Sequence, residues 1–275
     1  MARELSEFAA GMGGGASLSA QSAGEGPAIV LLHGLTATRR YVVMGSRLLE
    51  RSGLRVISYD ARGHGRSDPA PAGGGYDYGH LVSDLEAVMD AAGVDRAILA
   101  GASMGAHTAV RFALANPARV SALALITPAY DPARSRGADE LARWDALARG
   151  LREGGVEGFL AAYELDVVPA RWRAVVETVL RQRLSAHEHP LAVADALEEV
   201  PRSGPFERIG ELEEVRAPTL VVGSRDEADP GHPLSVAELY AESIPGARLA
   251  VEEEGSPIAW QGGQLSRLLL DLAER

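Results

Sequence analysis

Short apolar runs alternate along the chain with longer segments in which apolar residues recur at helical spacing. Six runs are rich in Val, Ile, Leu and Ala and are bounded by Gly, Pro or Asp, a composition typical of buried strands: 28–34, 54–60, 96–103, 120–127, 217–224 and 247–253. Because the runs are continuously apolar, they suit strands covered on both faces, as in a parallel sheet. Helical spacing is found at 41–52, 77–92, 104–116, 233–243 and 259–273. Strand followed by helix, repeated, predicts a doubly wound α/β sheet.

The alternation stops between residues 131 and 210, where segments such as GADELARWDALARGLREGG are helical in pattern and no run is typical of a strand. An all-helical insertion between two sheet strands would lie over the edge of the sheet as a cap. We therefore expect a core domain formed by 1–130 and 211–275 and a helical cap at 131–210; a helical excursion with no role in binding is the alternative. Near the N-terminus, the glycine-rich stretch GGGASLS predicts a hairpin turn.

A strand-to-helix junction carries the sequence Gly101-Ala102-Ser103-Met104-Gly105. A serine in G-x-S-x-G at such a junction sits on a tight, strained turn, where side chains at the glycine positions would clash with neighbouring backbone. The turn lifts the serine hydroxyl clear of the sheet at a helix N-terminus, where backbone N–H groups favour developing negative charge. The motif predicts a nucleophilic serine at position 103.

Two further segments are expected to meet this serine. LLHGLT at 31–36 ends a strand and leaves the backbone N–H of Leu35 free to point into the site. With the N–H of Met104 it would form an oxyanion hole, the donor pair that stabilises a tetrahedral acyl-transfer intermediate. In VVGSRDEADP at 221–230, Asp226 follows a strand end, where a carboxylate would orient a base.

Taken together, these segments resemble the α/β-hydrolase superfamily over nearly the whole chain. YDARGHGRSD at 59–68 and GYDYGHLVSDLEAVMD at 75–90 are similar to that family's next loop and helix. The resemblance is nearest to small, cofactor-free bacterial esterases, lactonases and perhydrolases. It implies the α/β-hydrolase fold, with Ser103 as nucleophile, Asp226 as acid, Leu35 and Met104 as oxyanion donors and 131–210 as the cap.

The sequence departs from the family where its histidine should stand, just after the last strand. Here the chain reads Gly255-Ser256-Pro257, and no histidine follows His232. Ser256 cannot replace the imidazole, because a hydroxyl has no proton affinity to offer near neutral pH. Removing a triad member costs orders of magnitude in rate and leaves the contributions of the oxyanion hole and of binding.

Another histidine is a possible surrogate base. His232 lies six residues past Asp226, on the rim where the carboxyl ends of the strands converge. Against this role, a helix N-terminus lowers the basicity of an imidazole, and PGHP is typical of a capping turn. Among the remaining histidines, His107 is expected to pack, and His33 and His64 are expected to organise turns. His80 lies early in a helix and shows nothing distinctive. His187 and His189, in the predicted cap, would either face solvent or hang over the site.

Carboxylates offer a second route to a base. Asp229 lies near Asp226, and an acidic run at 252–254 precedes the position of the absent histidine. A desolvated carboxyl with a raised pKa would serve as a base. The alternative is an acidic run that is simply solvated at a strand end.

The composition of the chain narrows the kinds of partner and site that it can have. The chain has 275 residues and a net charge of −11, which disfavours nucleic acid and anionic membrane as partners. It contains no cysteine, so disulfides and Cys-based zinc sites are excluded. An N-terminus that breaks into glycines does not look like a secretory signal, and a cytoplasmic location is the default expectation. We expect no cofactor and no metal.

Two classes of function remain open. The first is hydrolysis of a small carboxylic ester, thioester or lactone through an acyl-Ser103 intermediate, with an atypical or degenerate triad. The second is a small-molecule-binding protein on the same fold, catalytically weakened by loss of the base, since fold alone does not fix function. A non-hydrolytic lyase or cyclase that positions a reactive substrate is a further alternative.

Overall fold

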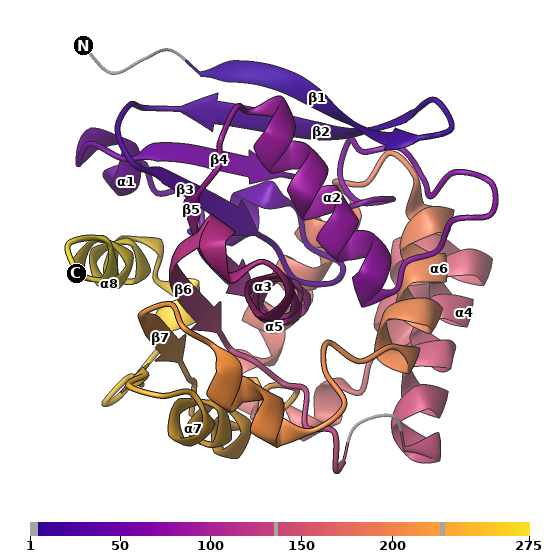
Figure 1. Ribbon diagram of the computed structural model, residues 1–275. Coiled ribbons are helices and arrows are strands. Elements are labelled where there is room, and N and C mark those ends of the chain that lie inside the picture. The colour runs from indigo at the N-terminus through magenta and orange to yellow at the C-terminus, as the bar shows by residue number, and fades with distance from the viewer. Residues whose placement is uncertain (1–4, 135–136, 226–228) are drawn as a thin grey trace.

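The structure, a computed structural model, describes residues 5–134, 137–225 and 229–275. Its centre is an eight-stranded sheet in the order β1-β2-β4-β3-β5-β6-β7-β8 (Figure 1). Pairs from β4 through β8 are parallel, whereas β2 pairs antiparallel with β1 and with β4. The strands are β1 (Ser6–Gly13), β2 (Ala16–Ala23), β3 (Ala28–Leu32), β4 (Arg55–Tyr59), β5 (Ala97–Ala102), β6 (Val120–Ile126), β7 (Thr219–Val222) and β8 (Arg248–Ala250). The predicted parallel α/β sheet is confirmed, and each of the six predicted runs contains one strand.

Helices cover both faces of the sheet, which is why its central strands are apolar on both sides. On one face α2 (Tyr78–Ala91), α3 (Met104–Ala115) and α7 (Leu234–Ser243) pack on a core that includes Leu99 and Leu123. On the other face α1 (Leu48–Arg51) and α8 (Gly262–Ala273) pack on a core that includes Ile98 and Ala124. Neighbouring positions of one strand therefore supply opposite cores, as the period of two in a strand requires.

One predicted helix is wrong in extent. Residues 41–52 form the short helix α1 at their C-terminal end, preceded by a single 3-10 turn at Arg39–Tyr41. Between them, Met44 and Gly45 have φ values of 49° and 73°. Because a right-handed helix cannot contain residues in the left-handed region, the apolar spacing here does not become a continuous helix.

The N-terminal hairpin turn is present. Gly14 and Gly15, with φ values of 59° and 88°, connect β1 to β2. A glycine adopts this conformation without the steric cost that a Cβ would bring. The two strands themselves are not evident from sequence because their Ala, Ser and Gly residues have low strand propensity.

Between β6 and β7 the described residues form helices and no strand: α4 (Ala138–Ala162), α5 (Ala170–Leu184), α6 (Pro190–Glu199) and three 3-10 turns, Leu165–Val167, Val200–Arg202 and Ile209–Glu214. This helical segment has a core of its own, which includes Leu151, Phe159 and Leu197. Helix α4 folds back on itself at Gly155, which has a φ of 59°. A Cβ on Gly150 would lie 2.4 Å from the carbonyl oxygen of Gly158, so glycine permits the two arms to touch. The predicted helical insertion is confirmed, and its status as a separate domain stays a prediction.

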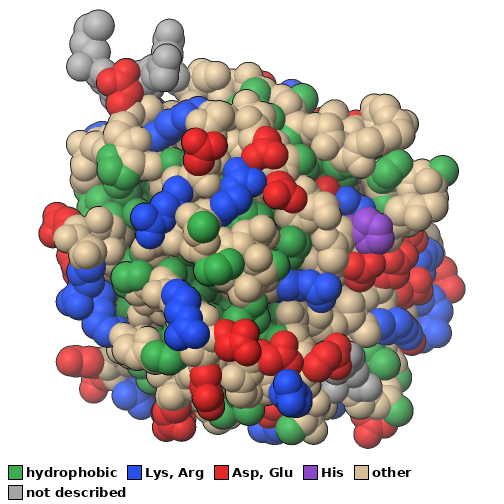
Figure 2. Space-filling view, in the orientation of Figure 1, with side chains coloured by type: hydrophobic (Ala, Val, Ile, Leu, Met, Phe, Trp, Pro, Cys, Tyr) green, Lys and Arg blue, Asp and Glu red, His purple; other side chains and the backbone are tan. Residues whose placement is uncertain are grey.

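The surface carries both signs of charge. Figure 2 shows acidic and basic side chains interspersed on one face, with no continuous basic area. Among the described residues, none of the helices combines the length and the apolar character that crossing a membrane would demand.

Candidate active site

The nucleophile candidate lies at a sharp turn between β5 and α3. Ser103 has φ 51° and ψ −113°, a conformation that is rare for a residue with a Cβ and that is found at functional sites. Its N–H donates to the carbonyl of Ile126 at 2.9 Å, and its own carbonyl accepts from the N–H of His107 at 3.0 Å. The hydrogen bonds at both ends hold the residue in this conformation.

Two glycines allow the turn to form. A Cβ on Gly101 would lie 2.1 Å from the carbonyl oxygen of Gly105, and a Cβ on Gly105 would lie 2.2 Å from that of Leu32. Real Cβ atoms do not approach backbone so closely, so neither position accepts a side chain without displacement of the strand or the helix. The G-x-S-x-G spacing thus has the steric cause expected from the sequence.

A histidine contacts the serine. The Nε2 atom of His232 lies 2.8 Å from the Oγ of Ser103. On the other side of the ring, Nδ1 lies 2.8 Å from the Oδ2 of Asp229, although the N–H bond is not aimed along this line. An ionised carboxylate can only accept, so it favours the proton on Nδ1 and leaves the Nε2 lone pair facing the serine.

Asp229 and His232 come from one loop, between β7 and α7. Asp229 and His232 are three residues apart, and the turn is closed by a hydrogen bond from the N–H of His232 to the carbonyl of Asp229 at 3.1 Å. Each side chain is 24% exposed. The loop therefore presents both groups together at the rim where parallel strands end.

Asp229 and His232 each shift the pKa of the other. Burial lowers the pKa of His232, but the neighbouring carboxylate of Asp229 outweighs burial and holds that pKa above its usual value; Arg183 opposes this effect. Burial raises the pKa of Asp229, yet His232, with a smaller contribution from Arg183, brings it below its usual value. The lowering of imidazole basicity expected at a helix N-terminus is thus outweighed by a neighbouring carboxylate.

Asp226, the acid expected from the sequence, lies outside the described residues. The carboxylate that contacts His232 in the described structure is Asp229, which sequence reasoning weighed as a base and not as the partner of His232. Ser256 follows β8, and its carbonyl accepts a hydrogen bond from the side chain of Gln261 at 2.6 Å.

The turn after β3 lies against the nucleophile. A Cβ on Gly34 would lie 3.4 Å from the Cβ of Ser103, so this turn touches the elbow. Within the described part of the chain, the N–H of Leu35 donates to no protein acceptor. Met104 is the first residue of α3, where the N–H has no partner inside the helix. Met104 therefore follows Ser103 directly in sequence, and Leu35 follows the glycine whose backbone lies against Ser103.

Three neutral histidines fix this turn and its surroundings. His33 accepts from the N–H of Ala61 at 2.8 Å and donates through Nδ1 to the carbonyl of Gly34 at 2.8 Å. His64 accepts from the N–H of Thr36 at 3.3 Å. Burial is the largest cause that lowers the pKa of each ring, so both stay neutral and keep one acceptor nitrogen. The turn-organising role expected for these two residues agrees with their contacts.

His187 is the third, and it is not a free surface residue. It accepts from the N–H of Gly65 at 2.8 Å through Nδ1 and donates through Nε2 to the carbonyl of Thr36 at 3.0 Å. Burial lowers its pKa to about 4. His107, by contrast, packs inside: it lies 2.8 Å from the hydroxyl of Tyr78 and accepts from the N–H of Tyr130 at 3.1 Å.

The acidic run after β8 is partly structural. Glu252 is 5% exposed and accepts from the N–H of Arg225 at 2.6 Å and from the hydroxyl of Ser224 at 3.3 Å. It therefore anchors the beginning of the loop that leads to Asp229. Glu252 is therefore not part of a simple solvated run.

Aromatic side chains connect the helical segment to the core near the site. Trp172 of α5 packs edge-on against Trp260, with ring centroids 5.8 Å apart. Leu35 packs with the same cluster. The sequence left open whether the aromatic residues of this segment line a pocket or pack on the sheet; Trp172 packs where the segment meets the core.

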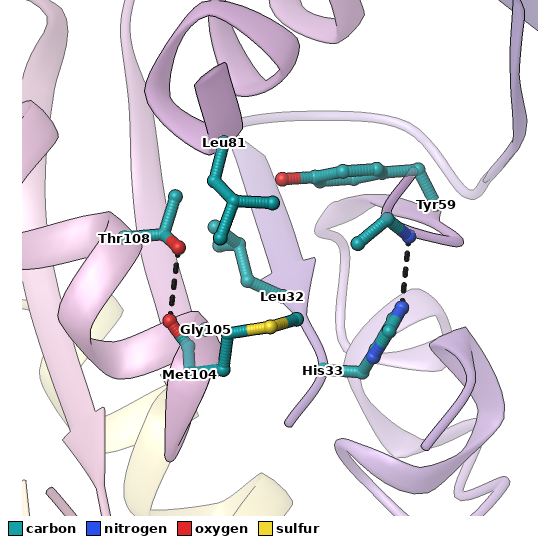
Figure 3. A pocket seen from close by; sticks show the side chains of 8 residues that line it. Leu32, His33, Tyr59, Leu81, Met104, Gly105 and Thr108 are labelled. Carbon is teal, nitrogen blue, oxygen red and sulfur yellow. Dashed lines mark hydrogen bonds between the residues drawn. The ribbon is translucent and has the colours of Figure 1, made fainter. Parts of the chain in front are cut away.

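A small cavity lies behind the elbow and is lined by Leu32, His33, Tyr59, Ala61, Leu81, Met104, Gly105 and Thr108 (Figure 3). In this view the Thr108 hydroxyl donates to the carbonyl of Met104, and His33 accepts from Ala61. Ser103 is not among the residues that line this cavity, so we do not assign the cavity to substrate. In the part of the chain that the structure describes, no three His, Asp or Glu side chains gather as a metal ion would require.

Comparison with known proteins agrees with this architecture. Residues 27–260 match the family model for the alpha/beta hydrolase fold. A 2-hydroxy-6-oxononadienedioate/2-hydroxy-6-oxononatrienedioate hydrolase of Pseudomonas putida is 30% identical over 91% of this chain and 89% of its own length.

Two solved structures are similar throughout. A hydrolase from Pseudomonas aeruginosa PA01 has a TM-score of 0.78 and 26% identity, covering 99% of both chains. The N-acyl homoserine lactone degrading enzyme Est816 has a TM-score of 0.76 and 27% identity, covering 96% of this chain and 99% of its own. The chain therefore belongs to the α/β-hydrolase family and is an enzyme of the hydrolase type.

Proposed function

We propose that the protein hydrolyses a small carboxylic ester, thioester or lactone through an acyl intermediate on Ser103, with His232 as general base and Asp229 as the acid that orients it. The observation that carries the proposal is the chain of two contacts, 2.8 Å from Ser103 Oγ to His232 Nε2 and 2.8 Å from His232 Nδ1 to Asp229. A serine hydroxyl, a base and an orienting carboxylate in this order form the arrangement that activates a serine.

The acylation step follows from this geometry. As Ser103 Oγ attacks the substrate carbonyl carbon, its proton passes to His232 Nε2, and Asp229 stabilises the imidazolium that forms. The carbonyl oxygen becomes an oxyanion next to the N–H groups of Leu35 and Met104. His232 then returns the proton to the departing alcohol or thiol oxygen or sulfur as the C–O or C–S bond breaks. In a lactone, the departing group stays attached to the acyl chain.

Deacylation repeats these steps with water. A water molecule gives its proton to His232 and attacks the acyl carbon, and the imidazolium then protonates Ser103 as the acid product leaves. Every proton in the cycle passes through one imidazole. The placement of His232 on the β7 loop, in place of the usual position after β8, does not change this sequence of transfers.

A fluorophosphonate probe and p-nitrophenyl acetate test the proposal. We expect Ser103 to be labelled, and we expect Ser103→Ala and His232→Ala each to lose at least about 10³-fold in turnover, as for other triad members. The matched control is His80→Ala, since His80 pairs with Asp77 at the start of α2, outside the site. Labelling and turnover that are equal in parent and Ser103→Ala would refute the proposal and favour a binding function.

A further inference from the structure

Two side chains of the helical segment reach the turn that follows β3. Arg183, next to the end of α5, donates through Nη2 to the carbonyl of Leu35 at 2.8 Å and to the hydroxyl of Thr36 at 3.1 Å. His187, between α5 and α6, donates to the carbonyl of Thr36 at 3.0 Å. The same ring accepts from the N–H of Gly65, so its Nε2 must carry the proton.

The turn needs such support because its backbone is strained. Thr36 has a φ of 63°, and the left-handed region is costly for a β-branched residue, by roughly 1–3 kcal/mol. Its N–H, hydroxyl and carbonyl are all bonded, to His64, Arg183 and His187 respectively. Two of the three partners belong to the helical segment and one to the core.

The peptide groups on either side of Leu35 are held by different parts of the structure. On one side, the carbonyl of Gly34 accepts from His33 of the core. On the other, the carbonyl of Leu35 accepts from Arg183 of the helical segment. The N–H of Leu35 lies between these two anchored carbonyls, so its direction depends on both.

Arg183 is suited to this task and has no competing ion pair. Within the described residues, no carboxylate oxygen lies within ion-pair distance of its guanidinium, and its buried Nε has no hydrogen-bond partner. Its strongest polar contacts are with the neutral oxygens of the turn. A planar guanidinium bonds two such oxygens at once, which a lysine ammonium does with less geometric constraint.

We infer that Arg183 and His187 are positioning residues that aim the N–H of Leu35 at the oxyanion, so the helical segment contributes to the catalytic site. This inference rests on the proposed function. Neither residue touches the reacting atoms. His187 acts through the backbone of Thr36, and Arg183 acts through the backbone of Leu35 and also through its charge, which lowers the pKa of His232 and of Asp229. Their contribution should therefore appear in the transition state and not in substrate binding.

Steady-state kinetics with p-nitrophenyl acetate and inhibition by 1,1,1-trifluoro-4-phenylbutan-2-one test this. The ketone forms a hemiketal oxyanion with an active serine, so its Ki reports on the oxyanion donors. We expect Arg183→Gln and His187→Leu to lower kcat about 10- to 100-fold, to leave KM within about threefold, and to raise Ki by the same factor as kcat falls. His187→Gln, which can still donate and accept, should recover most of the lost rate.

Arg181→Gln is the matched control, since Arg181 lies on the same helix and pairs with Glu157 and Glu177 on the exposed side. It should keep the parental kcat and Ki. Hydrogen exchange of the peptide containing 33–41 gives a readout that does not depend on activity: exchange should rise in Arg183→Gln and stay unchanged in Arg181→Gln. Where Arg183→Gln does not fold, His187→Leu and His187→Gln provide the same comparison.

The two proposals fail in different ways. If Ser103→Ala retains parental turnover, the proposed function fails and the inference with it. If turnover depends on Ser103 but Arg183→Gln and His187→Leu keep the parental kcat and Ki, the inference alone is overturned. A parallel rise of KM, with kcat unchanged, would also overturn it, because that result places the two residues in substrate binding.

Discussion

Substitution of Asp229 by Asn tests the most unusual element of the site, an acid and a base only three residues apart. The carboxylate lies 2.8 Å from His232 Nδ1. At an effective dielectric constant of about 20, a full charge pair at this distance is worth about 6 kcal/mol, an upper limit for these partly exposed groups. Asparagine removes the charge, and its amide can donate to Nδ1, which places the ring proton on Nε2 and blocks proton acceptance from Ser103.

We expect kcat/KM for p-nitrophenyl acetate to fall about 10²- to 10⁴-fold, or about 3–5 kcal/mol of transition-state stabilisation, within that limit. The dependence of kcat/KM on pH gives a second measure. Catalysis needs neutral His232, so the rate rises with pH through the pKa of that residue, which Asp229 raises. Without the Asp229 carboxylate, burial and Arg183 still lower the pKa of His232. The rising limb of the pH profile of kcat/KM should therefore move to lower pH.

Asp166→Asn is the control, because it makes the same change in charge on a fully exposed side chain. Asp226→Asn, at the position that the sequence suggested for the acid, should cost much less than Asp229→Asn. An Asp229→Asn enzyme with kcat/KM within threefold of the parent, or with its rising limb unmoved, would refute the assignment. A larger loss in Asp226→Asn would transfer the role to that residue.

Three further results are expected. Gly101→Ala should lower the thermal midpoint sharply and abolish turnover, since its Cβ would lie 2.1 Å from the carbonyl oxygen of Gly105; a stable, active variant would contradict the tight turn. Ser256→His should leave turnover within about threefold of the parent, because the Oγ of Ser103 already has a base; a large gain would show that this base is ineffective. Stability should fall as pH drops from about 6.5 toward 4, because His187 is neutral when folded, with a pKa of about 4, and binds a proton more readily when unfolded. The cost is at most about 3 kcal/mol, and denaturant titrations of the parent and His187→Gln should differ over this range.

The sheet and its order of strands and helices follow from the sequence because parallel strands covered on both faces must be continuously apolar. In β1 and β2 the side chains are small, so the apolar signal of a strand is lost. The glycine turn between them is the one feature that the sequence predicts. The helix predicted over 41–52 is wrong for another reason: the apolar spacing does not reveal the positive φ values of Met44 and Gly45. Backbone conformation at such positions is set by tertiary contacts.

The elbow is evident from sequence because steric exclusion leaves a local signature in its glycines. The relation between Asp229 and His232 has a weaker signal, the i, i+3 spacing in DPGH, which is also typical of an ordinary capping turn. Arg183 gave no signal, because a single arginine in an Arg-rich helix looks like a solvated surface residue. Its contact with Leu35 joins residues 148 positions apart, which requires the fold to be known.

Placing the carboxylate and the imidazole on one short loop makes them a single mechanical unit. In a site assembled from two separate loops, either partner can shift while the other stays in register with the serine. Here a change in the backbone between β7 and α7 displaces both groups at once, so the serine either has its full proton relay or has none of it. On the proposed assignment Ser256, after β8, has no part in that relay and is open to sequence change, whereas Glu252 is constrained because it anchors the loop.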